Sequence, residues 1–198
     1  GDASVALSIQ FEYDVLGRMI GETFSGGVST KRWYDKDGHL IKGEVYGDGL
    51  QPNRLAASYN LRGWLESETW QVDGSYYELE YDYDESGNVA SMTYPDGTVV
   101  PFSYDWAGRL EEIGGYVDSI VYNGNDAPTF VSYANGVSTT YDLDARNRIQ
   151  SLQATNPITV ETVFDLAYTF TRSGNVSSVT DATNTVGAPI KCRYGYDA

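Results

Sequence analysis

A seven-residue phrase recurs along the chain and constrains its fold more than any other feature. The phrase reads Tyr, Asp, two variable residues, Gly, a polar residue and an aliphatic residue, and its best preserved copy runs from Tyr104 to Leu110. The first residues of successive copies lie 21 to 27 residues apart, apart from one gap of 39 residues. A fixed period of this length indicates a repeat protein and not a chain with one central core.

The copies share an aromatic or aliphatic first residue and a Gly or Asn in the fifth position. The residues that define them are Tyr13, Asp14, Gly17, Tyr34, Asp35, Gly38, Tyr59, Gly63, Tyr83, Asp84, Gly87, Tyr104, Asp105, Gly108, Asp144, Asn147, Phe170 and Gly174. The 39-residue gap predicts a degenerate copy of the phrase at Tyr122, with a closing turn at Asn135-Gly136. We therefore expect one array over residues 1–198 with about eight hairpin repeats, of which the first and last are incomplete and the one near 117–136 is degenerate.

Each phrase predicts a tight turn. Asp at the first corner and Gly at the fourth are typical of a type I turn followed by a residue with positive φ. Asn147 occupies the Gly position of its copy, and Asn is the residue that tolerates the left-handed region best after Gly. The five phrase aspartates are therefore interpreted as turn residues and not as paired catalytic carboxylates.

Alternation of residue types predicts strands on both sides of these turns. Between Tyr77 and Asp84, aromatic and aliphatic residues alternate with acidic ones, which is the period of a half-buried strand. Further turns are predicted where Asp or Asn precedes Gly between the phrases: Asp48-Gly49, Asp73-Gly74, Asp96-Gly97 and Asn135-Gly136. No helical periodicity of useful length is visible.

These patterns predict an all-β fold of consecutive antiparallel β-hairpin repeats that form a long coiled sheet. About sixteen strands are expected, and an open twisted sheet of more than about ten strands curls, closes or splits. The sheet is therefore expected to form a spiral or a wide arc.

Composition limits the partners of such a sheet. The formal charge is −15, and the chain carries 17 Tyr and 4 Trp. So many aromatic residues indicate a folded chain. The excess of carboxylates argues against nucleic acid, whose binding depends on Lys and Arg. It argues equally against an anionic membrane surface. No apolar run is long enough for membrane insertion, and no export signal is visible within the sequence.

Few residue types that support catalysis or metal binding are present in the chain. The chain has one Cys, Cys192, and one His, His39, so it cannot form an internal disulfide or a cysteine-rich metal cage. Asp35 and Asp37 resemble the start of a calcium loop, but His39 and Tyr46 stand where that loop needs oxygen ligands. No catalytic residue, metal site or cofactor is predicted, and the chain is expected not to be an enzyme.

The phrase, best preserved at Tyr104 to Leu110, resembles the YD repeat of the Rhs family. That family includes bacterial Rhs proteins, the C component of insecticidal toxin complexes, wall-associated proteins and the animal teneurins. The resemblance implies hairpins that spiral into a hollow β shell, which in the toxin members encloses a cargo polypeptide. It also implies export to the bacterial cell surface or the medium, with a signal outside this chain. No segment that closes the shell and no variable toxin tail is recognised, so a piece of a larger protein or a short array is expected.

Two functions other than catalysis remain open. The first is a structural scaffold, a segment of a shell wall whose partners are the neighbouring repeats of a parent protein and an enclosed cargo polypeptide. The alternative is a surface module that recognises a glycan or a protein through the aromatic face of the sheet. The candidate ligand contacts for that alternative are Trp33, Trp64, Trp70 and Trp106.

Overall fold

The computed structural model describes residues 8–47, 51–159, 161–183 and 189–196, and these residues form strands and turns without any helix. The chain divides into two compact units, residues 1–100 and 101–198. Each unit is described here by itself. The division falls inside one strand, β9, which begins at Val99 and ends at Tyr104.

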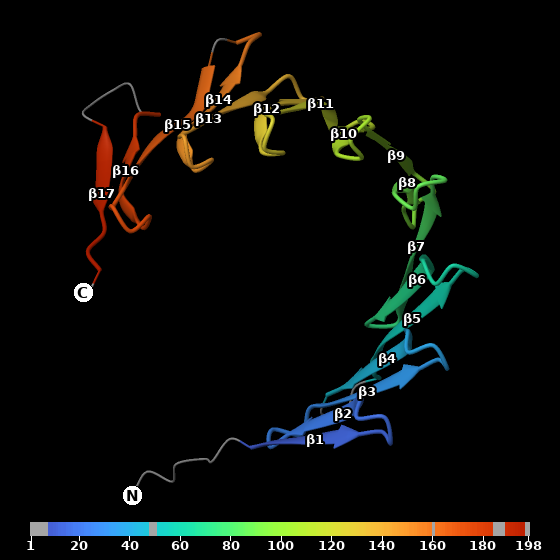
Figure 1. Ribbon diagram of the computed structural model, residues 1–198. Helices are drawn as coiled ribbons and strands as arrows, with labels where there is room; N and C mark the ends of the chain where they lie inside the picture. Colours follow the sequence, from blue (N-terminus) through green and yellow to red (C-terminus); the bar gives the residue numbers. More distant parts are fainter. Residues whose placement is uncertain (1–7, 48–50, 160, 184–188, 197–198) are drawn as a thin grey trace, which may run out of the picture. The chain divides into compact units, whose positions relative to one another are not determined.

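The first unit is an antiparallel sheet in which each strand pairs with the next along the chain (Figure 1). Its strands are β1 (Ile9–Tyr13), β2 (Met19–Phe24), β3 (Ser29–Tyr34), β4 (Leu40–Tyr46), β5 (Asn53–Tyr59), β6 (Leu65–Val72), β7 (Ser75–Tyr83) and β8 (Val89–Thr93). A turn from Tyr94 to Thr98 leads from β8 into β9.

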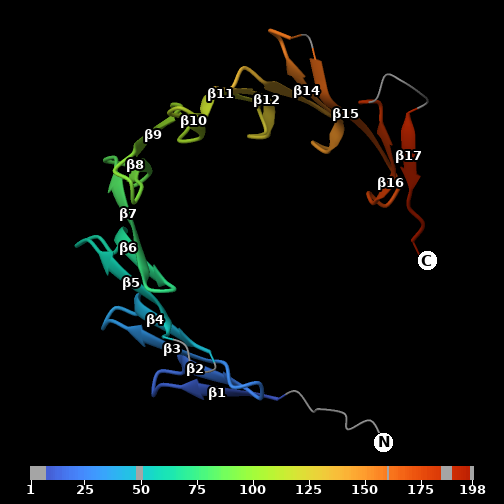
Figure 2. The same cartoon turned by 180° about the vertical axis from the view of Figure 1, so that it is seen from behind.

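The second unit repeats the same plan, and the view from behind shows its strands in the same succession (Figure 2). Its strands after β9 are β10 (Leu110–Ile113), β11 (Val117–Tyr122), β12 (Pro128–Tyr133), β13 (Ser138–Leu143), β14 (Ile149–Asn156), β15 (Glu161–Phe170), β16 (Val176–Asp181) and β17 (Ile190–Arg193). The predicted all-β fold of consecutive hairpins is thus confirmed, with seventeen strands in the described residues.

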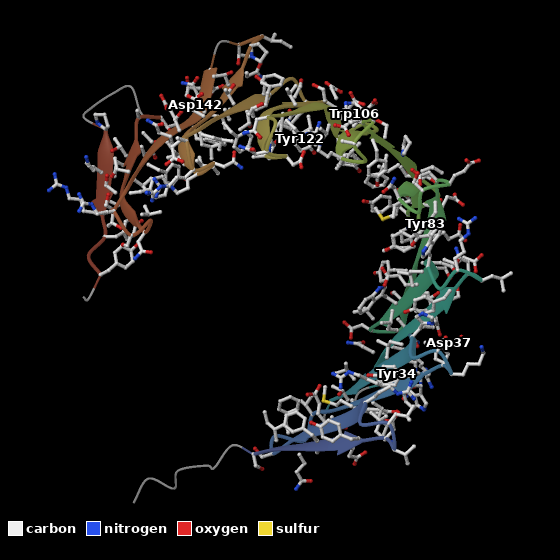
Figure 3. All side chains as sticks on the ribbon, in the orientation of Figure 1. Tyr34, Asp37, Tyr83, Trp106, Tyr122 and Asp142 are labelled. Atoms are coloured by element: carbon white, nitrogen blue, oxygen red, sulfur yellow. The ribbon has the colours of Figure 1, made fainter. Side chains whose placement is uncertain are left out.

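The sheet of each unit is a single layer, with side chains standing on both faces of the ribbon (Figure 3). Among the described residues, the buried apolar side chains are limited to Val100, Val131 and Ala154, and no large side chain is fully enclosed. Stability therefore depends on contacts between side chains of adjacent strands, which act as the unit of sheet stabilisation. It does not come from a core between two layers.

The turns between the phrases follow the sequence prediction with one refinement. Asp73 and Gly74 both have positive φ, 50° and 82°, as a two-residue hairpin turn requires. At Gly97 and Gly136 the loop has three residues instead, with the Gly at φ 82° and 81° as its last residue. Asp48-Gly49 lies outside the described residues.

The copy expected to be degenerate contains a turn of the phrase type at Asn123. Asn123 N–H donates to the carbonyl of Ala127, and Asp126 N–H donates to the carbonyl of Asn123. Asp126 takes the place of the phrase Gly with φ 60°. Asp, like Asn, enters this region at lower cost than other side chains because its short polar group bonds locally, which explains why the turn persists although the phrase has been lost.

Candidate functional site

The most regular arrangement of side chains in the molecule is the one that joins successive phrases. It starts at the turn, where the N–H of the fifth residue donates to the carbonyl of the second residue, an Asp, Asn or Thr, and closes a type I turn. The fifth residues all have positive φ: Gly17 79°, Gly38 97°, Gly63 78°, Gly87 91°, Gly108 76°, Asn147 62° and Gly174 99°. The Gly and Asn positions predicted from sequence therefore take the left-handed conformation.

The second residue of the phrase stabilises the same turn through its side chain. In the best preserved copy, Asp105 Oδ1 accepts from the backbone N–H groups of Ala107 and Arg109, at 2.9 and 3.0 Å. Asn60 Oδ1 does the same in its own copy, at 2.9 and 3.1 Å. Because one oxygen satisfies two backbone donors, Asp and Asn suit this position and longer side chains do not.

Each described phrase hairpin also carries a β-bulge next to its first residue. In the β1–β2 pair, for example, Glu12 lies opposite Gly21 whereas Tyr13 lies opposite Met19. The bulge places the aromatic ring at the end of its strand, beside the turn, and bulges increase local twist.

In five copies the hydroxyl of the tyrosine in the first position reaches back to the preceding phrase. It donates to the backbone carbonyl of the seventh residue there: Tyr34 to Met19 at 2.9 Å, Tyr59 to Leu40 at 3.0 Å, Tyr83 to Leu65 at 2.8 Å, Tyr122 to Leu110 at 2.7 Å and Tyr196 to Val176 at 2.9 Å. The bond explains why the first position carries Tyr in most copies. Burial raises the pKa of Tyr83, so its hydroxyl stays a donor across the physiological range.

Replacing Tyr83 with Phe is expected to lower the free energy of unfolding of the first unit by about 1 kcal/mol, because the Leu65 carbonyl loses its donor. The matched control is Tyr76→Phe in the same strand, where the side chain is 68% exposed. Urea denaturation followed by circular dichroism gives both values. Equal midpoints for the two variants would contradict a stabilising role of the hydroxyl.

In five copies the sixth residue of one phrase packs on the first residue of the next phrase. The contacts are Arg18 over Tyr34 at 4.8 Å, His39 on Tyr59 at 4.6 Å, Trp64 on Tyr83 at 5.0 Å, Arg109 over Tyr122 at 4.6 Å and Arg148 over Phe170 at 4.1 Å. Guanidinium groups and rings both stack favourably on aromatic faces. We call this stacking contact, together with the tyrosine hydroxyl bond, the repeat clasp.

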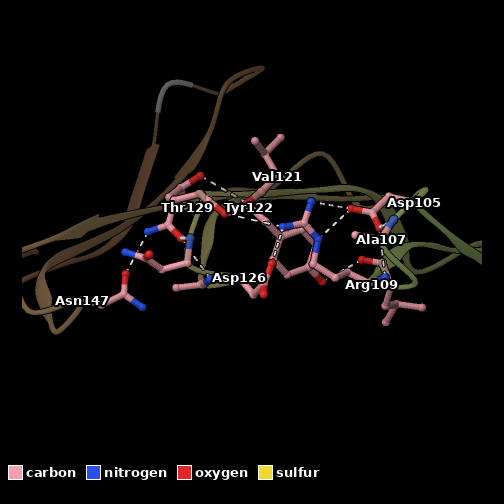
Figure 4. Close-up of polar contacts among 12 residues, drawn as sticks. Asp105, Ala107, Arg109, Val121, Tyr122, Asp126, Thr129 and Asn147 are labelled. Carbon is pink, nitrogen blue, oxygen red and sulfur yellow. Dashed lines mark hydrogen bonds and ion pairs between the residues drawn. The ribbon is translucent and has the colours of Figure 1, made fainter.

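Figure 4 shows one repeat clasp in the second unit. Arg109 lies between its own phrase and the next: Nε donates to Asp105 Oδ2 at 2.7 Å, and Nη1 donates to Asp126 Oδ1 at 2.8 Å. The guanidinium plane covers the ring of Tyr122 at the same time. One side chain thus pairs with two carboxylates and packs on an aromatic ring, a combination that Arg provides and Lys does not.

The turn carboxylates ionise easily because the folded chain stabilises their charged forms. Hydrogen bonds from the side chain and then the backbone of Arg148 lower the pKa of Asp144 to about 2. The side chain and then the backbone of Arg109 lower the pKa of Asp105. These carboxylates are therefore fully charged at neutral pH, where each is already paired within its own repeat.

The two residues with reactive side chains, His39 and Cys192, lie in different surroundings. His39 Nδ1 lies 2.9 Å from Asp35 Oδ2, and its ring stacks on Tyr59. His39 thus occupies the same place as Arg18 and Arg109 in their phrases. Cys192 is exposed on β17. Within the described ranges no group of three or more His, Cys, Asp or Glu side chains could hold a metal ion.

The four tryptophans are spread over different surroundings and do not form one platform. Trp64 belongs to a repeat clasp, with Arg62 stacked on it at 4.9 Å. Trp33 lies on β3 under the ammonium group of Lys42 at 4.4 Å, and Trp70 is partly exposed on β6. Trp106 is 96% exposed at a turn, which makes it the most accessible of the four (Figure 3).

The sequence pattern described the sixth position only as polar and did not reveal its partner. It also missed the pairing of Arg32 with Glu22, whose Oε1 accepts from Arg32 Nη2 at 2.7 Å. The recurrence of Arg in three sixth positions was the signal for the clasp, while Arg32 and Glu22 had no recurring pattern to reveal them.

The comparisons with known proteins fit this architecture. The family model described as RHS Repeat matches residues 83–114, which contain the phrases at Tyr83 and Tyr104. This chain carries Rhs repeats.

Two bacterial toxins are relatives of this Rhs-repeat chain. It is 25% identical over 187 residues to the double-stranded DNA deaminase toxin A of Burkholderia cenocepacia, covering 93% of the chain and 10% of that toxin. It is 29% identical over 122 residues to the toxin protein Tse5 of Pseudomonas aeruginosa, covering 52% of the chain and 9% of Tse5. The chain thus spans about a tenth of the length of these relatives, as a repeat segment of toxin-related proteins.

Solved structures show the same fold. The Rhs-repeat chain matches the crystal structure of TcdB2-TccC3 with a TM-score of 0.65 and 16% identity, over 95% of this chain and 12% of that one. It matches the Photorhabdus luminescens Tc holotoxin pore with a TM-score of 0.61 and 15% identity, over 92% and 12% of the two chains. Among the residues described, no helix is long and apolar enough to cross a membrane.

Proposed function

We propose that this chain is a non-catalytic segment of the wall of a β shell in a larger exported bacterial protein, and that the shell encloses a polypeptide cargo. The observation that carries the proposal is the single-layered sheet held together by repeat clasps. Such a sheet has two accessible faces and extends by adding repeats, which suits a wall that separates an interior from solvent.

The relatives support this proposal through their length and their names. Both are named as toxins and are about ten times as long as the matched segment. We therefore assign toxic activity to parts of such proteins that lie outside this segment.

Non-catalysis is supported by the way the reactive side chains are used. His39 is held between Asp35 and Tyr59 in a repeat clasp, where other phrases carry Arg. Cys192 is exposed, and its neighbours Lys191 and Arg193 offer no general base. A nucleophile needs a base within hydrogen-bond reach, and the hydrogen bonds of His39 go to Asp35 and not to a Ser, Thr or Cys side chain that it could activate.

Limited proteolysis of the full-length protein tests the enclosure. In the wild type, the enclosed polypeptide is expected to resist the protease. Gly87→Ala distorts a repeat clasp and should loosen the wall, so the same protease concentration is expected to degrade the polypeptide in that variant. Gly108→Ala is the matched control, because nothing lies within 4 Å of a Cβ added there. Equal degradation of the same polypeptide in wild type and both variants would overturn the enclosure.

A second candidate, a surface module that binds glycans, is favoured by the exposure of Trp106 alone. An accessible tryptophan at a turn offers a flat apolar face to a sugar ring. Saturable binding of a glycan that Trp106→Ala removes would favour this candidate over a purely structural wall.

A further inference from the structure

A row of side chains crosses the sheet of the first unit and is interrupted at one position. In the ladders, Arg32 lies opposite Gly43, Gly43 opposite Leu55, and Leu55 opposite Trp70. Directly opposed residues of antiparallel strands share one face of the sheet. At Gly43 the row has no side chain, so a gap remains between Arg32 and Leu55.

The gap forms a cavity of about 180 Å³, which we call the Gly43 notch. Its lining includes Thr30, Arg32, Val45, Asn53, Leu55 and Trp70. An engineered apolar cavity of about 150 Å³ is large enough to bind benzene. The notch therefore has room for one aromatic ring or one branched aliphatic side chain.

The backbone does not require glycine here. Gly43 is not among the residues with positive φ. A Cβ built on it would meet Leu55 Cβ at 3.8 Å and the carbonyl oxygen of Lys31 at 4.0 Å, which are ordinary contact distances. Glycine within a strand weakens the strand and often marks a place where another group approaches closely. The missing side chain is thus a cost to the fold that a ligand would explain.

The wall of the notch holds an incompletely paired cation. Arg32 Nη2 donates to Glu22 Oε1 at 2.7 Å, while Nη1 is buried and has no hydrogen-bond partner in the described residues. A buried donor without an acceptor costs free energy. A carboxylate that enters the notch would supply the missing acceptor, after a small rotation of the guanidinium group.

Charge near the notch is divided between the two faces of the sheet. Lys42 and Arg54 pair with Glu44 on the face opposite the notch, at 3.0 and 3.1 Å, and Lys31 lies opposite Glu44 on that same face. Arg32 lies on the notch face, where Glu22 engages Nη2 only. Arg32 is therefore the cation that a carboxylate entering the notch would meet.

We propose that the Gly43 notch binds a polypeptide segment that inserts an aromatic or branched aliphatic side chain and presents a carboxylate next to it to Arg32. Trp70 and Val45 are 43% and 47% exposed, and they offer apolar surface to the inserted side chain. This proposal goes beyond the wall function, because it concerns a binding site within one unit.

The test is an NMR titration of the 198-residue chain with N-acetyl-L-phenylalanine, which carries both a ring and a carboxylate. Saturable shifts of the Gly43 amide and the Trp70 indole signals are expected. N-acetyl-L-phenylalaninamide, which lacks the charge, is expected to bind about tenfold more weakly, as for the loss of one charged hydrogen bond. N-acetylglycine, which lacks the ring, is expected to produce no saturable shift.

Variants distinguish the notch from the rest of the face. Gly43→Val should fold at least as stably as wild type, since Val favours strands, and should abolish binding by filling the notch. Gly26→Val is the matched control, since a Cβ at Gly26 meets nothing within 4 Å. Should Gly43→Val fail to fold, Arg32→Gln must lower the affinity for N-acetyl-L-phenylalanine to that for the amide.

Absence of saturable shifts, or equal binding by wild type and Gly43→Val, would overturn the proposal. Neither result would bear on the wall function, which the proteolysis experiment tests separately.

Discussion

Gly87→Ala is expected to lower the free energy of unfolding of the first unit by about 2–5 kcal/mol. Two costs combine: a left-handed conformation costs a residue with a Cβ about 1–2 kcal/mol, and over-packing adds about 1–3 kcal/mol. The backbone has φ +91° at Gly87, and the new Cβ would lie 2.8 Å from Cζ2 of Trp64. The ring cannot withdraw freely, because it packs against both Tyr83 and Arg62.

Urea denaturation of wild type and variant measures this loss. Gly108→Ala separates the two costs, because its φ of +76° gives the same strain without a contact within 4 Å. It should lose only about 1–2 kcal/mol. If both variants lost the same amount, the Trp64 stack would contribute nothing to the repeat clasp.

Acid is expected to remove the stabilisation that the turn carboxylates provide. The pKa of Asp144 is lowered to about 2 in the folded chain, whereas an unfolded Asp has a pKa of about 3.9. A lowered folded-state pKa contributes stability that is present above the unfolded value and is lost as pH falls through the folded value. The window of loss for Asp144 therefore runs from about pH 4 to about pH 2.

The decisive comparison is between wild type and Asp144→Asn across this window. Asn keeps an oxygen that can accept from the backbone N–H groups of Arg146 and Arg148, so the substitution removes the charge and spares the turn. Protonation of other carboxylates also reduces self-repulsion in a chain of −15, which shifts both proteins alike. The wild type should melt higher at pH 7, and the difference in Tm should shrink towards zero near pH 2. A difference that is constant with pH would contradict the role of the Arg148 pairing.

Local features of the fold were predictable because each depends on a few neighbouring residues. The turn needs an oxygen at Asp105 and a positive φ at Gly108, and both requirements are visible in the letters of one phrase. The same logic identified Asn147 in a Gly position and the degenerate copy at Tyr122. Hairpins between adjacent strands then follow from turn spacing and alternation.

Contacts between phrases were less visible, since they depend on strand register. The stacking of Trp64 on Tyr83 joins residues nineteen positions apart, and a bulge beside each phrase tyrosine shifts the pairing by one residue. A shift of one residue moves a side chain to the other face of the sheet. The opposition of Arg32, Gly43 and Leu55 could not be worked out without knowing where those bulges lie.

The direction of the repeat clasp has a consequence for how such chains lengthen. Each clasp runs from the sixth residue of one phrase to the first residue of the next, as from His39 to Tyr59 or from Arg109 to Tyr122. The repeat at Tyr34 therefore carries both ends of the contact, since Tyr34 receives Arg18 and His39 packs on Tyr59. A duplicated repeat would fit between any two others without new complementary surfaces having to evolve, provided that the duplication respects the period. Gene duplication within the array therefore requires few further changes in sequence. A substitution that disrupts one repeat clasp leaves the clasps on either side with their own partners.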